Sequence, residues 1–132
     1  MDELPDWPEG TAVVLSTGGG DPHAIPVSTA FRSGPHAVML GLALGRESLA
    51  RLRREPACAL TVLAAGDLAF TAHGRAVVVD EGERIAAVRI DVERIQDHGT
   101  DRFVIEDGVR WRWTDRDAER ADASVRAALR AL

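Results

Sequence analysis

The junction between a small-residue run and a following arginine and serine is the part of the sequence best suited to binding chemistry. Residues 41–44 end a stretch that we expect to be a buried strand, and residues 45–55 are expected to form a helix. The first N–H groups of a helix are unpaired and carry partial positive charge. Arg46 and Ser48 add a guanidinium and a hydroxyl there, which together suit an anion. A capped helix with a solvated arginine fits the pattern equally well.

A second feature that could bind a phosphate is the run of three glycines, Gly18, Gly19 and Gly20. A phosphate-binding loop needs a strand, a glycine-rich turn and then the N-terminus of a helix. Here the glycines are followed by Asp21-Pro22 and another expected strand. The pattern therefore favours a hairpin turn over a phosphate loop.

Metal sites and nucleophilic sites have no clear signature in the chain. The four histidines, His23, His36, His73 and His98, are scattered along the chain. No HExxH or CxxC spacing occurs, so we expect no metal site. No serine sits in a nucleophile-elbow context. A Ser/His/Asp triad stays open, because its members need not be close in sequence.

Four further side chains have both a structural and a functional interpretation. His73 lies mid-strand before Gly74, where a histidine bonded to a backbone partner is favoured over a cofactor or substrate contact. Trp111 and Trp113 are two residues apart and share a face of a strand, where core packing is favoured over stacking on a ligand or at an interface. Cys58, the one cysteine, sits in an apolar run and is expected to be core.

Composition narrows the class of protein. The chain has 132 residues, enough for one domain, and its net charge is −5, which disfavours a nucleic-acid partner. All 16 of its basic Lys and Arg residues are arginines, so any anion site must be built from Arg, His, hydroxyls or backbone N–H groups. No apolar run approaches the length of a membrane span, and the N-terminus is acidic, unlike a signal peptide. We expect a cytoplasmic protein without a membrane anchor.

The elements that would position these residues are mostly short strands separated by turn signals. Asp107-Gly108 between apolar runs is the signature of a two-residue hairpin turn. The pattern predicts a mainly β fold, a barrel of about 6–8 strands whose strands part at one place. It has a short helix between its third and fourth strands, capped at Ser48 or starting slightly earlier, and a C-terminal helix. The expected strands are residues 11–17, 23–32, 36–44, 57–64, 68–79, 88–93, 103–106 and 109–113, and the helices are residues 45–55 and 115–132.

Residues 45–63, GRESLARLRREPACALTVL, resemble a segment of the pyridoxamine 5′-phosphate oxidase-like proteins, the flavin-binding split β-barrel superfamily. PHAIPVSTAF and HAVMLGLALG resemble the second and third strands of that family, and LAFTAHGRAVVV resembles its long strand with a central glycine. The resemblance covers residues 11–79, and the remaining tail fits as added strands and a helix. It implies a single split-barrel domain over residues 1–132.

The resemblance also implies a homodimer that holds flavin mononucleotide (FMN) or a deazaflavin in the groove between two barrels. The family's phosphate lies against the helix N-terminus. Its usual lysine falls here on Ser48 and its usual asparagine on Arg51, while Arg46 keeps the basic position two residues before the lysine. Arg46 or Arg51 would then compensate for the missing charge. The implied cofactor-binding residues are Pro26, Val27, Ser28, Leu42, Ala43, Arg46, Ser48, Leu49, Arg51, Trp111 and Trp113.

The expected function is that of a flavin-dependent oxidoreductase that transfers hydride to or from a small substrate. His73 is the one candidate catalytic side chain, and it would be the haem ligand if the chain belonged to a haem-binding branch. Two alternatives remain: a non-catalytic carrier of haem or flavin, and a structural dimer without a cofactor. The loss of the family lysine at Ser48 is what makes the structural dimer an alternative.

Overall fold

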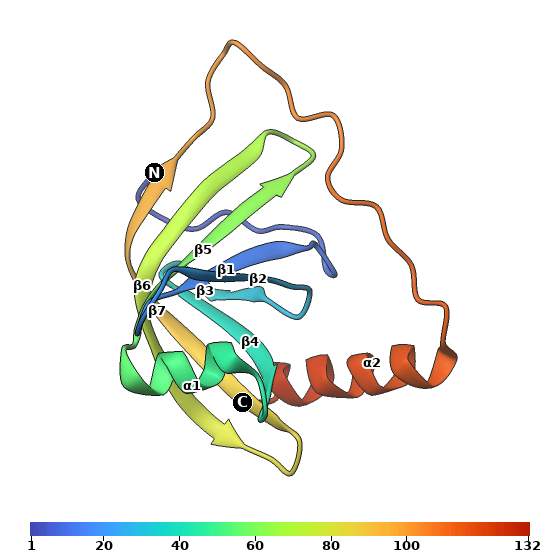
Figure 1. The fold of residues 1–132 in the computed structure, drawn as a ribbon. Coiled ribbons are helices and arrows are strands. Elements are labelled where there is room, and N and C mark those ends of the chain that lie inside the picture. The colour runs from blue at the N-terminus through green and yellow to red at the C-terminus, as the bar shows by residue number, and fades with distance from the viewer.

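The computed structural model describes all residues, 1–132, and consists of seven strands and two helices (Figure 1). The strands are β1 (Val13–Thr17), β2 (His23–Val27), β3 (Phe31–Gly34), β4 (Ala37–Ala43), β5 (Ala57–Ala64), β6 (Leu68–Glu81) and β7 (Ile85–Asp97). Helix α1 (Glu47–Arg54) lies between β4 and β5, and helix α2 (Arg116–Arg130) follows β7. Neither helix has the length and apolar character that crossing a membrane requires.

All seven strands belong to one antiparallel sheet, in the order β2-β1-β5-β6-β7-β4-β3. The sheet curls round so that its two edge strands, β2 and β3, follow each other in the chain without pairing (Figure 1). Pro26 lies on β2, opposite Val14 of β1. Because proline has no N–H to donate to a neighbouring strand, it is found mainly on edge strands. The predicted parting of the barrel therefore lies between β2 and β3.

Alternate residues of the strands point into one apolar core. Leu15, Leu60, Phe70 and Val88 come from four different strands, and none has any exposed surface. Helix α1 closes one end of this core with Leu49 and Leu52, which are three residues apart and therefore share a helix face. This arrangement fixes the start of α1 beside the end of β4.

Helix α2 covers the outer side of β4. Its buried Leu129 forms a small cluster with Met39 and Ala87, separate from the main core. A Cβ added to Gly41 would lie 3.1 Å from Val125 Cγ1, so glycine at this position lets the helix approach the strand. The helix begins as the sequence predicts, because the Asp115 carboxylate accepts hydrogen bonds from the N–H groups at its start.

The predicted hairpin at residues 103–113 is wrong. Residues 98–115, here called the strap, form no strand and run along one side of the molecule from β7 to α2 (Figure 1). The Asp107 carboxylate accepts a hydrogen bond from Gly108 N, but the flanking residues bind different parts of the barrel. Ile105 N donates to Asp67 Oδ1 at 2.7 Å, and Trp111 Nε1 donates to the Gly10 carbonyl oxygen at 2.9 Å. Residues 103–113 form neither a turn nor a strand, and the two segments on either side of Asp107-Gly108 bind separate partners instead of each other.

Two other boundaries differ from the sequence prediction. The expected strand at residues 23–32 is divided into β2 and β3, because residues 28–30 cross the opening between the two sheet edges. The expected strand at residues 88–93 is part of the longer β7, which pairs with both β6 and β4. The number of strands is therefore seven, within the predicted range.

Candidate functional site

A cavity of about 230 Å³ lies at the opening of the barrel, between the end of β2 and the end of β4. One wall is the end of β2 with the residues that cross the opening, and the other is β4 with the start of α1. The lining residues are Pro26, Val27, Ser28, Thr29, Gly41, Leu42, Ala43 and Arg46. Six of these are residues that the resemblance implied, and the structure brings them together from segments about 15 residues apart.

Thr29 ties the two walls of this cavity together. Its hydroxyl accepts a hydrogen bond from Gly41 N at 3.1 Å and lies 3.3 Å from the Gly41 carbonyl oxygen, to which it donates. Neither residue was identified from the sequence. A threonine beside a proline-containing edge strand was a usable signal, but its partner twelve residues away was not visible without the fold.

Arg46 stands at the start of α1. It is the N-cap residue, its backbone is extended, and its side chain caps no N–H group. The residue is exposed and lines the cavity. No ion pair involves Arg46, so its charge is available to an anion.

Ser48 is one residue inside the helix rather than its cap. It is 1% exposed, and its hydroxyl has no hydrogen-bond partner. A buried hydroxyl without a partner is unfavourable unless some other group satisfies it. Ser48 lies in the first turn of α1 but is not among the residues that line the cavity.

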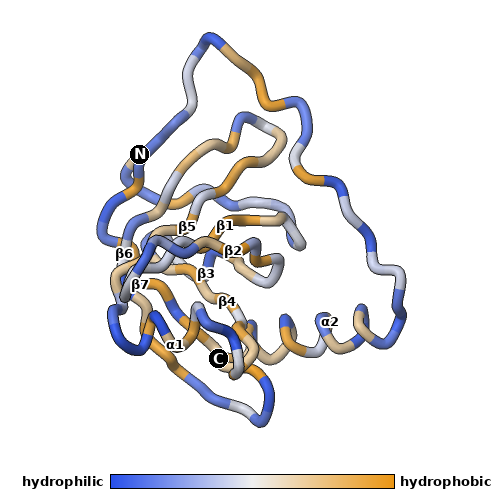
Figure 2. Tube along the Cα trace, viewed as in Figure 1, coloured by the Kyte–Doolittle hydropathy of each residue, from blue (hydrophilic) through white to orange (hydrophobic).

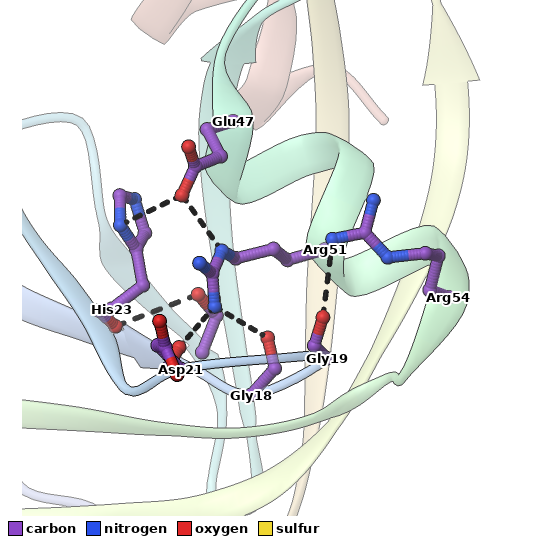
Figure 3. A network of polar contacts seen from close by, with 8 residues as sticks. Gly18, Gly19, Asp21, His23, Glu47, Arg51 and Arg54 are labelled. Carbon is purple, nitrogen blue, oxygen red and sulfur yellow. Dashed lines mark hydrogen bonds and ion pairs between the residues drawn. The ribbon is translucent and has the colours of Figure 1, made fainter.

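Arg51 does not line this cavity and points toward the turn between β1 and β2 (Figure 3). Its guanidinium donates to the Gly18 carbonyl oxygen at 3.2 Å and to the Asp21 carbonyl oxygen. Its Nε donates to Glu47 Oε2 at 2.8 Å. The side chain is only 12% exposed, so its charge is satisfied within the protein. The three glycines thus form a turn held by arginine, as the hairpin interpretation predicts.

Glu47 links this arginine to His23. The carboxylate oxygen that accepts from Arg51 also lies 3.1 Å from His23 Nδ1 (Figure 3). The hydrogen bond from Arg51 is the main cause that lowers the pKa of Glu47, and the charges of Arg51, His23 and Arg54 add to it. The carboxylate at the start of α1 is therefore already paired with a cation.

A second cavity of about 230 Å³ continues the first. The two share Pro26, Val27 and Ser28, and the second is also lined by Trp111 of the strap. Trp113 packs edge-on against Trp111, with ring centroids 5.1 Å apart. Together the two cavities form a groove, here called the β2 groove, with Arg46 near one end and an indole ring near the other.

The remaining predicted residues lie elsewhere. Leu49 is 2% exposed and packs in the core. His73 is on the outer face of the sheet, where its Nε2 lies 3.2 Å from Gln96 Oε1, and it lines neither cavity. No three His, Cys, Asp or Glu side chains come together as a metal site.

The β2 groove suits an elongated molecule with an anionic end and a planar ring. Arg46 offers a guanidinium, which binds phosphate through paired hydrogen bonds. Pro26 and Val27 offer an apolar wall, and Trp111 a ring for stacking. Each cavity alone is smaller than a usual ligand pocket of roughly 300–1,000 Å³, so both are needed to hold one cofactor.

No family model and no curated protein sequence matches this chain. Solved structures do match it. A putative pyridoxamine 5′-phosphate oxidase from Listeria innocua is 14% identical, with a TM-score of 0.57 over 68% of this chain and 90% of that one.

Two further structures have the same fold. Group A Streptococcus HupZ is 15% identical, with a TM-score of 0.58 over 67% of this chain and 87% of that one. The Streptomyces globisporus C-1027 NADH:FAD oxidoreductase SgcE6, solved with NAD and FAD fragments, is 15% identical, with a TM-score of 0.56 over 66% and 74%. The chain therefore has the split-barrel fold of the pyridoxamine 5′-phosphate oxidase-like superfamily.

Proposed function

We propose that this protein is a flavin-dependent oxidoreductase that holds FMN, or a deazaflavin, in the β2 groove. The observation that carries the proposal is the placement of a free arginine, Arg46, and an indole ring, Trp111, along one groove. SgcE6 has this fold and was solved with fragments of a flavin cofactor, which supports the same use of the fold here.

Different residues of the groove would bind different parts of the cofactor. Arg46 holds the phosphate together with the first N–H groups of α1. Pro26, Val27 and Ser28 lie along the ring system, and Trp111 covers it. Bound there, the cofactor supplies hydride transfer, while the chain orients the ring and excludes water.

We also propose that the protein works as a homodimer. The strap exposes several large apolar side chains, of which Phe103 is 44% and Val104 72% exposed. Figure 2 shows apolar stretches along the strap between polar ones. A second copy that covers the strap would bury these side chains and close the open side of the β2 groove. We expect Val104→Glu to convert a dimer, measured by light scattering, into a monomer.

The single, unpaired cysteine of the chain is consistent with a cytoplasmic location. Cys58 is buried and unpaired. A chain with one thiol and no disulfide suits a reducing compartment. We therefore propose the cytoplasm as the place where the protein acts.

Titration of the purified protein with FMN tests the cofactor assignment directly. We expect flavin fluorescence to change on binding, and Arg46→Ala to weaken the affinity by about 10-fold, as loss of a charged hydrogen bond does. Arg120→Ala is the matched control, because it removes the same charge from an exposed site on α2. Unchanged affinity in Arg46→Ala would overturn the phosphate assignment.

Absorption spectra separate the alternative functions. A haem carrier would give a Soret band with added haem, and a deazaflavin protein would bind that cofactor in preference to FMN. If none of the three binds, the chain is a structural dimer on the same fold. If flavin binds but no hydride transfer occurs with any acceptor, it is a flavin carrier.

A further inference from the structure

A third cavity, of about 530 Å³, continues the β2 groove along the strap. It shares Ala12 and Val109 with the cavity that Trp111 lines. Its floor is the outer face of β1 and β5, with Val14 and Leu63, and its roof is the strap, with Ile105. It is therefore an apolar space that adjoins the Trp111 end of the groove.

One hydroxyl in this apolar wall is connected to solvent through a chain of hydrogen bonds. Thr61 lines the cavity, and its Oγ1 lies 2.9 Å from Thr71 Oγ1. Thr71 Oγ1 in turn lies 2.8 Å from His98 Nε2. Thr71 is 8% exposed, whereas His98 is an exposed residue at the start of the strap. The three side chains thus run from water, through a buried hydroxyl, to the cavity wall.

The order of these groups suits proton transfer into the cavity. When the imidazole carries a proton on Nε2, it donates to Thr71, and Thr71 donates to Thr61. The hydroxyl of Thr61 then donates to whatever lies in the cavity. His98 is exposed to water, so its imidazole can take up a proton from solvent and refill the chain. Asp107 also lines the cavity, and its carboxylate disfavours an anionic substrate.

We propose that this cavity holds the substrate, a small neutral molecule with a conjugated carbonyl, and that Thr61 protonates it; the proposal rests on the proposed function. The β-carbon of the substrate receives a hydride, with its electron pair, from the reduced flavin, and the C=C π bond breaks. The carbonyl oxygen takes the proton of Thr61, giving an enol that becomes a saturated ketone. Thr71 reprotonates Thr61, His98 reprotonates Thr71 and water reprotonates His98. The flavin is left oxidised. Thr61 is the catalytic residue, while Thr71 and His98 are positioning residues.

The cofactor-free protein provides the first test, with cyclohexenone as the probe. We expect its addition to shift the NMR amide signals of Thr61, Leu63 and Val109, and Thr61→Val to weaken binding by about 5-fold, as loss of one hydrogen bond does. Shifts confined to other parts of the molecule, such as the groove between α2 and the β6–β7 turn, would overturn the assignment.

The second test uses the flavin-loaded protein and cyclohexenone, with dithionite as the reductant that returns the flavin to its reduced form after each turnover. Thr71→Val keeps the shape of the side chain but breaks the chain of hydrogen bonds behind Thr61. We expect kcat to fall by about 10-fold or more, the low end of what proton transfer contributes, with KM and flavin affinity unchanged. Thr71→Ser should restore kcat. His36→Gln is the control, since this exposed histidine bonds to the Asp2 carbonyl oxygen, outside the groove.

The two tests separate this proposal from the proposed function. If the protein binds no flavin, the proposed function fails, while the amide shifts with cyclohexenone still decide whether the cavity takes a conjugated carbonyl. If flavin binds and Thr71→Val turns over as fast as the unmodified protein, the proton path is overturned and the flavin assignment stands.

Discussion

The guanidinium of Arg51 donates a hydrogen bond to the main-chain carbonyl oxygen of Gly18, 3.2 Å away, and so joins helix α1 to the turn between β1 and β2. The strand that leaves this turn, β2, provides one wall of the β2 groove, and the start of α1 provides part of the other. One side chain that touches neither cavity therefore holds the two walls in register.

Replacing Arg51 with alanine tests this joint. The side chain is 12% exposed and donates to two carbonyl oxygens and one carboxylate, so we expect the free energy of unfolding to fall by about 2 kcal/mol. Arg53→Ala, on the same helix, removes only an exposed ion pair with Glu81 and should cost about 0.5 kcal/mol. Urea unfolding of the two variants measures both values, and equal losses would contradict the role of Arg51.

The pH dependence of stability should report the pairing of Glu47. The hydrogen bond from Arg51 lowers the pKa of Glu47 in the folded protein. Its stabilising contribution is therefore complete above the ordinary glutamate pKa of about 4.3 and is lost as the pH falls through the lower, folded value. We expect Glu47→Gln to be less stable than the unmodified protein at neutral pH and to approach it in acid. A stability gap between the two that stays constant between neutral pH and acid would rule out the pairing.

A glycine in the middle of β6 should tolerate no side chain. A Cβ added to Gly74 would overlap the carbonyl oxygen of Asp91 on β7, at a register shift between the two strands. Since backbone cannot yield as a flexible side chain does, we expect Gly74→Ala to lower the free energy of unfolding by about 3 kcal/mol. Gly45→Ala is the control, because a Cβ there meets nothing within 4 Å. Thermal unfolding of both variants tests this expectation. Two similar melting temperatures would contradict the close approach of Gly74 to the Asp91 carbonyl oxygen.

The single thiol should be inert in the folded protein. Burial raises the pKa of Cys58 to about 11, so the thiolate that reacts with thiol reagents is scarce at neutral and mildly basic pH. We expect a coloured disulfide reagent to label Cys58 slowly in the native protein and rapidly after unfolding in urea. Rapid labelling without denaturant would show that β5 opens locally.

Much of the fold could be predicted because its pattern is local. The alternation of apolar residues marks most of the strands, and the missing N–H of Pro26 indicates an edge strand, a bulge or a strand open to a ligand, of which the structure has the edge strand. Pro26, Ser28, Leu42 and Arg46 could be named together only through a resemblance to proteins of known fold, and the structure does bring them to one cavity. Periodicity alone would have left these residues as two unrelated segments.

What the sequence could not reveal depends on partners that are distant in the chain. Arg51 looked like a ligand for an anion, but its guanidinium binds the Gly18 and Asp21 carbonyl oxygens, which no local pattern points to. Asp107-Gly108 predicted a hairpin, but the segments on either side of it bind Asp67 and Gly10 instead of each other. The expectation for Arg51 came from the resemblance and that for Asp107-Gly108 from a short-range signal, and in both cases the observed contacts join segments far apart in the chain.

The pairing of β4 with β7 also has a consequence for how the chain folds as it is made. Ala37 lies opposite Asp91, and Ala43 opposite Ile85, so β4 meets its neighbour only after a long stretch of intervening chain has been synthesised. During that interval β4 has only the short β3 as a neighbour in the sheet. Non-local pairings of this kind slow folding. A nascent chain that ends before β7 should therefore be held by chaperones, and its release should coincide with the arrival of the β6–β7 hairpin.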